Sequence, residues 1–447
     1  MSGAVIGVQV KQGGNVRRGA LGRRWAAWAA SAVLVATGAA TASAATTITF
    51  WHDWGSGSSG GQTIESVVQQ FNKSQSDVQV KIVVTSNQGQ KLMAAVAGGA
   101  SPDVVLLDRF TTSQFAANGA LRPLDDLIAA DGLSPATFFG PTWQEANWQG
   151  KQYGIPTNTD SRVLLYLKST LEQVGIDANR PPDTWEALRS ASLKMTQKQG
   201  GKLSKVGFIP DWGNISLKEY IWSNGGSLLS PDMTKVTFAE PAAQEALRFV
   251  VDFVDQYGGQ EAIDEFGQRV DWTAGSLGPM LRGQVGLIFE GSWALGDVLK
   301  NFPALYHNEL AAGLPPAMVR RATLSGGHGL VIPAGAAHPQ AAWKFIRYFT
   351  SQEAQIRFAL GTGIIPANRE AAVSPQLIQD PVRRVFIQAM EYTFVRPNHP
   401  AYPQIDALIS DAWWKAIRHQ MSPQSALEES ARQAQLILDR YNQHYRK

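Results

Sequence analysis

Three tryptophans that stand in glycine-containing turns beside a carboxylate are the side chains with the clearest chemical potential. They occur in the strings His52-Asp53-Trp54-Gly55, Pro210-Asp211-Trp212-Gly213 and Glu290-Gly291-Ser292-Trp293. An aromatic ring can pack on the C–H face of a sugar ring while a neighbouring carboxylate accepts hydroxyl protons. These turns therefore predict carbohydrate contacts, with a purely structural ring as the alternative at each. Trp185 and Trp343 fall at apolar helical positions instead, which predicts core packing.

A second string, Gly55-x-Gly57-x-x-Gly60, matches the dinucleotide-binding fingerprint between an expected strand and an expected helix. That fingerprint requires an acidic residue at the end of the next strand, about 20 residues further on. The next strand here ends in Val84-Thr-Ser-Asn87, which contains none. We therefore expect no nucleotide and no other cofactor. A flexible loop over a polar ligand is favoured, with the helix N-terminus behind it available to hydroxyls or an anion.

The residue types and their spacing argue against a metal site and against a catalytic nucleophile. The chain has no cysteine, which excludes disulfides, thiolate metal sites and a thiol nucleophile. No pair of the seven histidines has metal-ligand spacing, so no metal site is expected. No Gly-x-Ser-x-Gly nucleophile elbow occurs. Because paired acids are defined by distances in space, a secreted glycoside hydrolase that uses Asp53, Asp108, Asp160 or Glu290 stays open as an alternative.

The first 44 residues have the order of a secretory signal peptide. A basic segment precedes the apolar run 25–36, and the small-residue site Ala42-Ser-Ala44 follows. The apolar run of 12 residues is too short to span a bilayer as a helix. We expect cleavage after Ala44 and secretion to the periplasm, since no cysteine is available for a lipid anchor. A retained membrane anchor is the alternative, and Arg23-Arg24 leaves a twin-arginine export route open.

Without this leader the chain is nearly neutral. It has 40 basic and 37 acidic residues, and five basic ones lie in the leader, which leaves 35 basic against 37 acidic. A nucleic-acid partner would need a basic face, so none is expected. No other stretch approaches the ~18 consecutive apolar residues of a membrane span. The 403 residues after Ala44 are enough for two or three domains.

The alternation of strands and helices after the leader predicts a parallel doubly wound α/β sheet. Strands are expected over 46–51, 78–85 and 102–108, and helices over 62–75 and 91–99. Ligands of such sheets lie beyond the carboxyl ends of the strands. Those ends are Trp51–Trp54, Ser86–Gln88 and Asp108-Arg109, which adds Asn87, Asp108 and Arg109 to the candidate ligand contacts.

Helices dominate beyond residue 160. Apolar periodicity and proline starts predict helices over 241–257, 339–350 and 422–441, and another that begins near Asp183. Short strands are expected at 206–209, 286–289 and 329–332. The chain contains no internal repeat and no disordered linker, which two lobes that the chain crosses more than once would explain.

A series of short segments, in order along the whole mature chain, resembles the extracellular solute-binding proteins of ABC sugar importers, of the maltose- and glycerol-3-phosphate-binding type. Each segment is weak alone, but their order is specific. The segments are Thr49-Phe-Trp-His52, Gly99-Ala-Ser-Pro-Asp103, Gly119-Ala-Leu-Arg-Pro123, Gly150-Lys-Gln-Tyr-Gly-Ile-Pro156, Pro181-Pro-Asp-Thr-Trp185, Gly283-Gln-Val-Gly-Leu287, Gly291-Ser-Trp293, Ser325-Gly-Gly-His-Gly329, Ala341-Ala-Trp-Lys-Phe345, Gly361-Thr-Gly-Ile-Ile-Pro366 and Pro400-Ala-Tyr-Pro-Gln-Ile405.

The resemblance implies a two-lobed periplasmic-binding-protein fold of the α/β class, each lobe a sheet flanked by helices, with a three-crossing hinge. The crossings would lie near 156–160, 327–331 and 366–371. Lobe one would be 46–156 with 330–368, and lobe two 157–329 with 369–447. It further implies a monomer that captures a small-molecule carbohydrate, a neutral oligosaccharide or disaccharide, and delivers it to the permease subunits of an ABC importer in the inner membrane. No enzymatic step is expected.

The resemblance also implies ligand contacts by position. They are the loop of His52, Asp53 and Trp54; the acid–base pair Asp108 and Arg109; the hinge residues Asn158 and Asp160; the stacking rings Trp212 and Trp293 with Glu290 and Gly291; the backbone at Gly327 and His328; and Arg396 and Tyr402 in the closing segment. A phosphorylated polyol, such as glycerol 3-phosphate or a glycerophosphodiester, is the alternative ligand, held by the Gly/Ser loop and Arg109. Four acids against two bases in these loops favour the neutral ligand.

Overall fold

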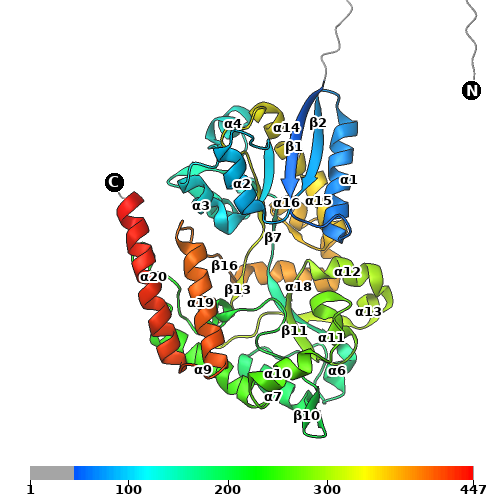
Figure 1. The fold of residues 1–447 in the computed structure, drawn as a ribbon. Coiled ribbons are helices and arrows are strands. Elements are labelled where there is room, and N and C mark those ends of the chain that lie inside the picture. Colours follow the sequence, from blue (N-terminus) through cyan, green and yellow to red (C-terminus); the bar gives the residue numbers. More distant parts are fainter. Residues whose placement is uncertain (1–44, 446–447) are drawn as a thin grey trace, which may run out of the picture. The chain divides into compact units, whose positions relative to one another are not determined.

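The computed structural model describes residues 45–445, and the expected leader lies outside them. Its first sheet has the strand order β2-β1-β3-β14-β6. The neighbouring strands β1 and β2 are labelled in Figure 1. β1, β2 and β3 are parallel as predicted, whereas β14 runs antiparallel to both β3 and β6. The strands are β1 (Thr46–His52), β2 (Val78–Val84), β3 (Val104–Asp108), β6 (Gly154–Pro156) and β14 (His328–Val331).

This sheet has an apolar core on each face, as expected for a doubly wound sheet. On one face Phe50 packs with residues of α1 and α14, and on the other Leu107 packs with Leu92 of α2 and Phe115 of α3. The helices around it are α1 (Ser59–Ser74), α2 (Gln88–Ala97), α3 (Thr112–Ala117), α4 (Asp125–Asp131), α5 (Gly140–Glu145), α14 (Pro339–Phe349) and α15 (Gln352–Thr362).

The second sheet is antiparallel, with the order β11-β8-β12. Every residue of its central strand β8 is buried, and Trp185 lies in the adjoining core as predicted. The strands are β8 (Arg162–Leu167), β11 (Leu287–Gly291) and β12 (Leu310–Gly313). The helices around it are α6 (Lys168–Glu172), α7 (Trp185–Met195), α8 (Leu217–Ser223), α9 (Pro241–Asp255), α10 (Gln260–Gly267), α11 (Gly278–Leu281), α12 (Ala294–Asn301), α13 (Pro303–Asn308), α16 (Arg369–Ala372), α17 (Pro375–Ile378) and α18 (Pro381–Ala389).

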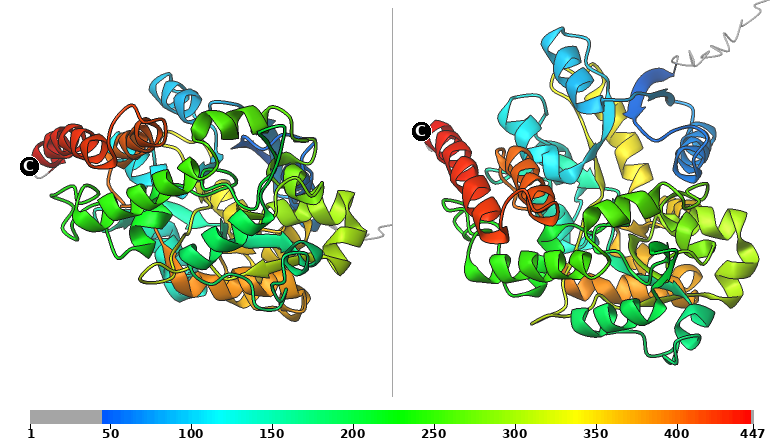
Figure 2. Two further views of the ribbon diagram at one scale, coloured as in Figure 1. Left: turned by 90° about the horizontal axis from the view of Figure 1, so that it is seen from below. Right: turned by 60° about the horizontal axis from the view of Figure 1, so that its bottom comes forward.

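Two long helices complete the chain, α19 (Tyr402–Ile417) and α20 (Pro423–Tyr445). They pack side by side and both contact α9, so that α20 forms the outer edge of the molecule in both views of Figure 2. The final helix begins at the Ser-Pro pair, as the sequence predicted. Trp413 of α19 is buried against Tyr220 of α8, which joins the last helices to the core of the second sheet.

The chain passes between the two sheets three times, which confirms the predicted hinge type. It leaves β6 for β8, returns to β14 through 325–327, and leaves α15 for α18. Two short pairs hold these segments together: β7 (Asn158–Thr159) with β15 (Ile365–Pro366), and β13 (Thr323–Leu324) with β16 (Thr393–Phe394). The lobe boundaries given above stay a prediction.

The remaining short elements include one correction. The expected strand at 206–209 is wrong: of these four residues only Val206 forms a bridge, an isolated one to Val285, and a hairpin of β9 (Gln197–Gln199) and β10 (Lys202–Lys205) precedes it. Backbone hydrogen bonds join Val206 and Gly207 to residues 284–287, but the pairing stops there, and Phe208 and Ile209 are buried in the core without a ladder. The other short elements are β4 (Asn147–Trp148), β5 (Lys151–Gln152), η1 (Arg109–Thr111), η2 (Pro135–Thr137), η3 (Gly275–Leu277) and η4 (Met390–Tyr392).

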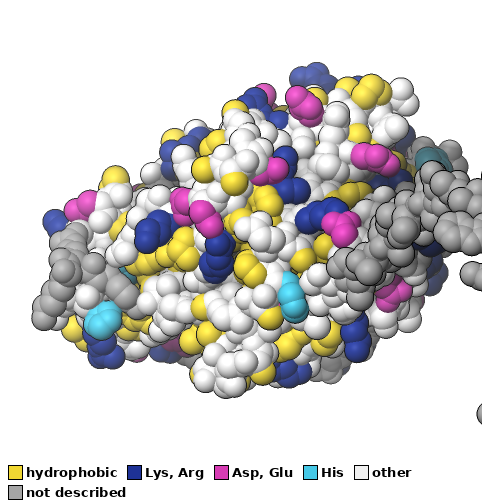
Figure 3. Space-filling view, turned by 90° about the horizontal axis from the view of Figure 1, so that it is seen from above, with side chains coloured by type: hydrophobic (Ala, Val, Ile, Leu, Met, Phe, Trp, Pro, Cys, Tyr) yellow, Lys and Arg dark blue, Asp and Glu magenta, His cyan; other side chains and the backbone are white. Residues whose placement is uncertain are grey.

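Charges are mixed on the molecular surface. On the face seen in Figure 3, lysine and arginine side chains lie among aspartate and glutamate side chains. Among residues 45–445, no helix is both long enough and apolar enough to cross a membrane.

Candidate ligand-binding site

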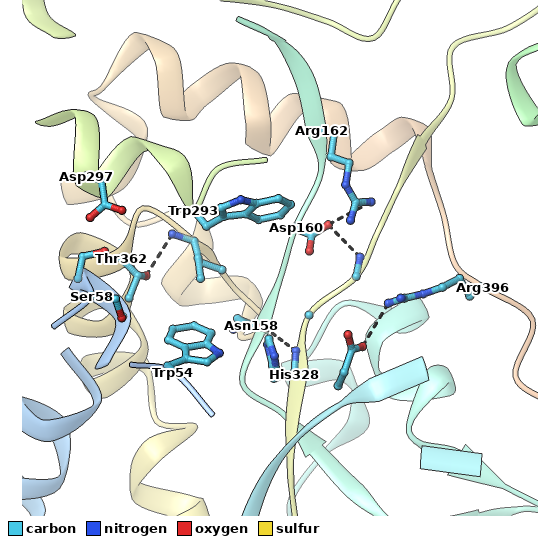
Figure 4. A pocket seen from close by; sticks show the side chains of 16 residues that line it. Trp54, Ser58, Asn158, Asp160, Arg162, Trp293, Asp297, His328, Thr362 and Arg396 are labelled. Carbon is cyan, nitrogen blue, oxygen red and sulfur yellow. Dashed lines mark hydrogen bonds and ion pairs between the residues drawn. The ribbon is translucent and has the colours of Figure 1, made fainter. Parts of the chain in front are cut away.

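A cavity of about 400 Å³ lies where the crossing segments meet the loop after β1, the end of β3, the start of α12 and the end of α15 (Figure 4). This volume falls in the lower part of the ~300–1,000 Å³ range of small-molecule sites. The predicted site residues that line it are Trp54, Asp108, Asn158, Asp160, Trp293, Gly327, His328 and Arg396.

Trp54 forms one wall of the cavity, and a glycine makes room for its ring. A Cβ at Gly60, in the first turn of α1, would overlap the indole of Trp54. The ring centroid lies 5.3 Å from that of His328 in an edge-on arrangement and 5.6 Å from that of Phe358. The last glycine of the Gly55-x-Gly57-x-x-Gly60 string is thus explained by close packing of an aromatic ring.

Trp293 lies on the opposite side of the cavity from Trp54 in Figure 4. It too rests against a glycine, because a Cβ at Gly291 would overlap its ring. The guanidinium carbon of Arg162 lies 5.5 Å from the ring centroid, within the range of a cation–π contact. Both indoles are therefore fixed by their surroundings while remaining only partly buried.

Asp160, from the first crossing, presents a carboxylate to the cavity. Its Oδ1 accepts a hydrogen bond from the backbone N–H of Gly326 (2.9 Å) and lies 3.8 Å from Nη1 of Arg162. Within the described chain its Oδ2 has no hydrogen-bond partner, and so remains available to a ligand hydroxyl.

Asp108 and Arg396 form the cavity wall at the end of β3. Nη2 of Arg396 lies 3.3 Å from Oδ1 of Asp108, and its guanidinium stacks 4.0 Å from the ring centroid of Phe110. Burial by itself would lower the pKa of Arg396, but Asp108 and the buried Glu145 outweigh it and raise the pKa above its ordinary value. Arg396 is therefore a permanent cation, largely neutralised by these two carboxylates.

The second crossing contributes backbone and a neutral imidazole. The N–H of His328 donates to Oδ1 of Asn158 (2.6 Å), so the amide nitrogen of Asn158 is left for other contacts. Gly327 has φ +118° and a Cβ there would overlap the Asn158 side chain, which requires glycine at this position. Burial lowers the pKa of His328, so its ring is uncharged at neutral pH.

Arg109, predicted as a ligand contact, is fully buried behind the cavity. It donates to the carbonyls of Asn158 in the first crossing, and of Gly326 and His328 in the second. Its Nε pairs with Oε2 of Glu145 at 3.2 Å. The structure thus places Arg109 as a clamp on two hinge crossings instead of bringing it to the ligand cavity.

Trp212 is likewise not brought to the cavity. Its ring stacks on Phe266 of α10 (5.7 Å, 19°) and contacts Trp272 (4.9 Å) at the edge of the second core. The turn sequence that suggested a sugar contact also suits a ring that folds back on its own lobe. This is the structural alternative considered for it above.

The other predicted site residues fall outside the cavity lining for distinct reasons. His52 and Glu290 are buried, and burial lowers the pKa of His52 and raises that of Glu290. Tyr402 is buried with its hydroxyl 2.9 Å from Asp406. Asp53 and Asn87 are exposed, and Gly291 acts through Trp293.

Several residues that line the cavity were not among those predicted from the sequence. Ser58 caps α1, accepting from the N–H of Gly61 (3.0 Å), and its place inside the string Gly55-x-Gly57-x-x-Gly60 is the signal that could have found it. Arg162 and Asp297 carry no local signal, because only the fold brings β8 and α12 to the cavity. The missed lining residues are Ser58, Ser59, Gly60, Arg162, Asp297, Gly326, Thr362 and Ile364.

The cavity lining contains more carboxylates than guanidinium groups. Its lining holds the carboxylates of Asp108, Asp160 and Asp297 against the guanidinium groups of Arg162 and Arg396. Each guanidinium already has a second buried carboxylate, Glu219 at 3.6 Å from Arg162 and Glu145 at 3.8 Å from Arg396. Within residues 45–445, no three side chains of the metal-binding types lie close enough together to hold a metal ion.

Comparison with known proteins finds binding proteins that share the sequence pattern and the fold. Among relatives, the chain is 23% identical over 346 residues to a maltotriose-binding protein of Pyrococcus abyssi, covering 76% of this chain and 71% of that one. It is 24% identical over 343 residues to an sn-glycerol-3-phosphate-binding periplasmic protein of Brucella melitensis, covering 72% and 75%. A solved structure, CpMnBP1 with mannotriose bound, superposes with a TM-score of 0.78 at 25% identity, covering 87% of this chain and 100% of that one.

The family comparison covers most of the chain. The family described as bacterial extracellular solute-binding protein matches residues 66–384, which include the second sheet, every strand of the first sheet except β1, and all three crossings. The chain belongs to the bacterial extracellular solute-binding protein family.

Proposed function

We propose that this protein captures a neutral oligosaccharide or disaccharide between its lobes and delivers it to an ABC importer. The observation that carries the proposal is the pair of indoles, Trp54 and Trp293, on opposite sides of a cavity whose lining includes Asp108 and Asp160. Rings and carboxylates in this arrangement suit the apolar faces and the hydroxyl edge of a pyranose. Relatives and neighbours named for maltotriose and mannotriose binding support the same ligand class.

A phosphorylated polyol is the second candidate, supported by the relative named for sn-glycerol 3-phosphate and by Arg162 and Arg396 in the lining. A phosphate dianion would need uncompensated cations, and both guanidinium groups are already paired with buried carboxylates. Asp108 and Asp160 would repel it. The neutral ligand is therefore preferred.

Calorimetric titration with maltotriose, mannobiose, mannotriose and sn-glycerol 3-phosphate tests the choice. We expect binding of at least one neutral sugar, and Asp108→Asn should weaken it by one or two orders of magnitude. Asp53→Asn, in an exposed side chain outside the cavity lining, is the matched control and should bind as the wild type does. Tight binding of the phosphate ester at physiological salt, improved by Asp108→Asn, would reject the neutral ligand. Chromatography of the sugar after long incubation should recover it intact, since release of shorter products would indicate a hydrolase.

Membership of this family also suggests where the protein works and with what partner. We propose that residues 1–44 are a cleavable signal peptide, that the mature protein works as a monomer in the periplasm, and that the permease recognises its closed form. N-terminal sequencing of the periplasmic protein should begin at Ala45. Solution scattering should show a smaller radius of gyration when the sugar is added, and an unchanged profile at saturation would argue against hinge closure.

A further inference from the structure

Glu145 is not part of the cavity lining, but its carboxylate lies within 4 Å of two arginines. Its Oε2 accepts a hydrogen bond from Nε of Arg109 at 3.2 Å, and its Oε1 lies 3.8 Å from Nε of Arg396. Arg396 in turn lines the cavity (Figure 4) and lies 3.3 Å from Asp108. Asp108, Arg396, Glu145 and Arg109 therefore form a continuous row of alternating charges that leads away from the cavity.

The link between Glu145 and Arg396 is incomplete. Their separation of 3.8 Å exceeds the ~2.7–3.2 Å of an N–H···O hydrogen bond. Oε1 of Glu145 and Nε of Arg396 are both buried, and neither has a hydrogen-bond partner among residues 45–445. Burial raises the pKa of Glu145, and the charges of Arg109 and Arg396 only partly oppose this shift. A buried acceptor and a buried donor thus stay unsatisfied, which is costly, although a movement of about 1 Å would join them.

The two sides of this gap belong to different parts of the fold. Glu145 is the last residue of α5, which contacts β6 of the first sheet. Arg396 precedes α19, which packs into the core of the second sheet. The side-chain amide of Asn398 donates to the carbonyl of Gln144 at 3.0 Å and keeps the two segments adjacent. A small movement of one segment against the other therefore changes the distance between Glu145 and Arg396 directly.

A ligand in the cavity acts on the other end of the row. The Asp108 side chain is 40% exposed, and its contact with Arg396 is a long one of 3.3 Å. Sugar hydroxyls that donate to Asp108 compete with this contact and free Arg396 for another acceptor. A ligand also displaces water from the cavity, which strengthens the attraction between the charges beside it. Both effects favour a bond from Arg396 to Glu145 when the cavity is filled.

We propose that Glu145 is a positioning residue for ligand binding, whose Oε1 accepts a hydrogen bond from Nε of Arg396 when a sugar is bound. This bond fixes Arg396 in the cavity lining. Through Arg109, which holds carbonyls of the first and second crossings, it also connects the ligand to the crossings. The inference rests on the proposed function, because a sugar in the cavity completes the row. Glu145 itself does not touch the sugar.

Exchange of arginine side-chain protons with water tests the proposal in the unaltered mature protein. Nitrogen-15 spectra are recorded with and without whichever of maltotriose, mannobiose and mannotriose binds, and the Arg396 Nε–H signal is identified by its loss in Arg396→Lys. At saturation, exchange of this proton should slow at least tenfold. The Nε–H of Arg109 is already bonded to Glu145 and is the internal control, so its exchange should not change. Unchanged exchange at Arg396 in a protein that binds the sugar overturns the proposal.

A double-mutant cycle followed by calorimetry gives an independent test. Glu145→Gln keeps an oxygen for Arg109 but places an amide N–H₂ group, which cannot accept a hydrogen bond, toward Arg396. We expect at least tenfold weaker binding from this change, and no further loss when it is added to Arg396→Met, because the partner is then absent. Gln144→Ala, at the exposed neighbouring position, is the control and should bind as the wild type does.

Two results of the cycle would overturn the positioning role while leaving the proposed function intact. One is wild-type affinity in a folded Glu145→Gln protein, as judged by circular dichroism. The other is a pair of losses that multiply in the double variant. If Glu145→Gln does not fold, the exchange measurement on the wild type decides. Failure of every sugar to bind the wild type would overturn the proposed function, and this inference with it.

Discussion

Arg109 and Glu145 form an ion pair, 3.2 Å between Nε and Oε2, in which both side chains are almost completely removed from solvent. Arg109 uses its other nitrogens to hold the carbonyls of Asn158, Gly326 and His328. A single guanidinium thus joins the end of the first sheet to two of the three crossings. The crossings of this protein are held by a buried charged residue that does not line the cavity.

Arg109→Met should destabilise the protein by about 3–5 kcal/mol, because it leaves a buried carboxylate and several buried carbonyls without their donor. Urea unfolding followed by circular dichroism measures the change. Arg189→Ala is the control, since its pair with Glu186 is partly exposed and should contribute less than about 1 kcal/mol. Equal small effects in both variants would show that Arg109 is not a clamp.

Gly60→Ala should weaken ligand binding by tenfold or more, because the new methyl group displaces the indole of Trp54. The fold should persist, since alanine favours the helix in which Gly60 lies. Gly57→Ala is the control: no atom of the described chain lies within 4 Å of its Cβ position, so affinity should not change. Calorimetry with the bound sugar compares the two, and equal affinities would remove Trp54 from the site.

The two remaining turn tryptophans should separate into a structural and a binding residue. Trp293→Ala should cost about 1–3 kcal/mol of binding free energy, the scale of an aromatic face lost from a ligand. Trp212→Ala should instead lower the free energy of unfolding, by about 3 kcal/mol for a partly buried ring, with little change in affinity. Calorimetry and urea unfolding of both variants test this, and the reverse pattern would contradict the assignments.

Asp211 should make stability fall as the pH rises from about 4 to 6. Burial raises its pKa from the ordinary value of 3.8 to about 6, with Gln260 opposing the shift. Between these values the folded protein keeps a proton that the unfolded chain has released, so unfolding becomes easier as the pH rises, by about 3 kcal/mol in all. Asp211→Asn should remove this slope and be the more stable protein above pH 6.

Asp232 provides a control of opposite sign. It is exposed, and hydrogen bonds from Ser230 and Thr234 lower its pKa, so its contribution is lost as the pH falls through that lowered value. Asp232→Asn should therefore leave the slope between pH 4 and 6 in place. Unfolding midpoints across this range compare the three proteins, and an unchanged slope in Asp211→Asn would rule out Asp211 as its source.

Local sequence patterns were enough to predict the main helices and strands of the first lobe. The spacing of Ile64, Val67, Val68 and Phe71 predicted the buried face of α1, and the apolar run before Asp108 predicted a strand covered on both faces. These predictions succeeded because helix and strand periodicity are properties of a few neighbouring residues. Element ends were displaced by a few residues, as for α1, which begins at Ser59 because Ser58 caps it.

The same reasoning from local patterns identified only some of the residues that line the cavity. Asp108, Asp160 and Trp293 were found because strand ends, hinge positions and family order mark them. Arg162 was missed, and Arg109 and Trp212 were assigned to the ligand, because the direction of a side chain depends on partners far away in the chain. Arg109 turns to carbonyls 49 and more residues distant, which no local pattern encodes.

The sequence by itself determined the α/β class, the order of the elements, the expected address outside the cytoplasm and the family, since these rest on periodicity, composition and the order of motifs. Tertiary structure alone decided which carboxylates share a cavity, which tryptophans line it, and that Arg109 turns away from it to the crossings. The physical reason is that a binding site consists of distances across a cleft, and the three crossings set those distances by joining segments more than 150 residues apart.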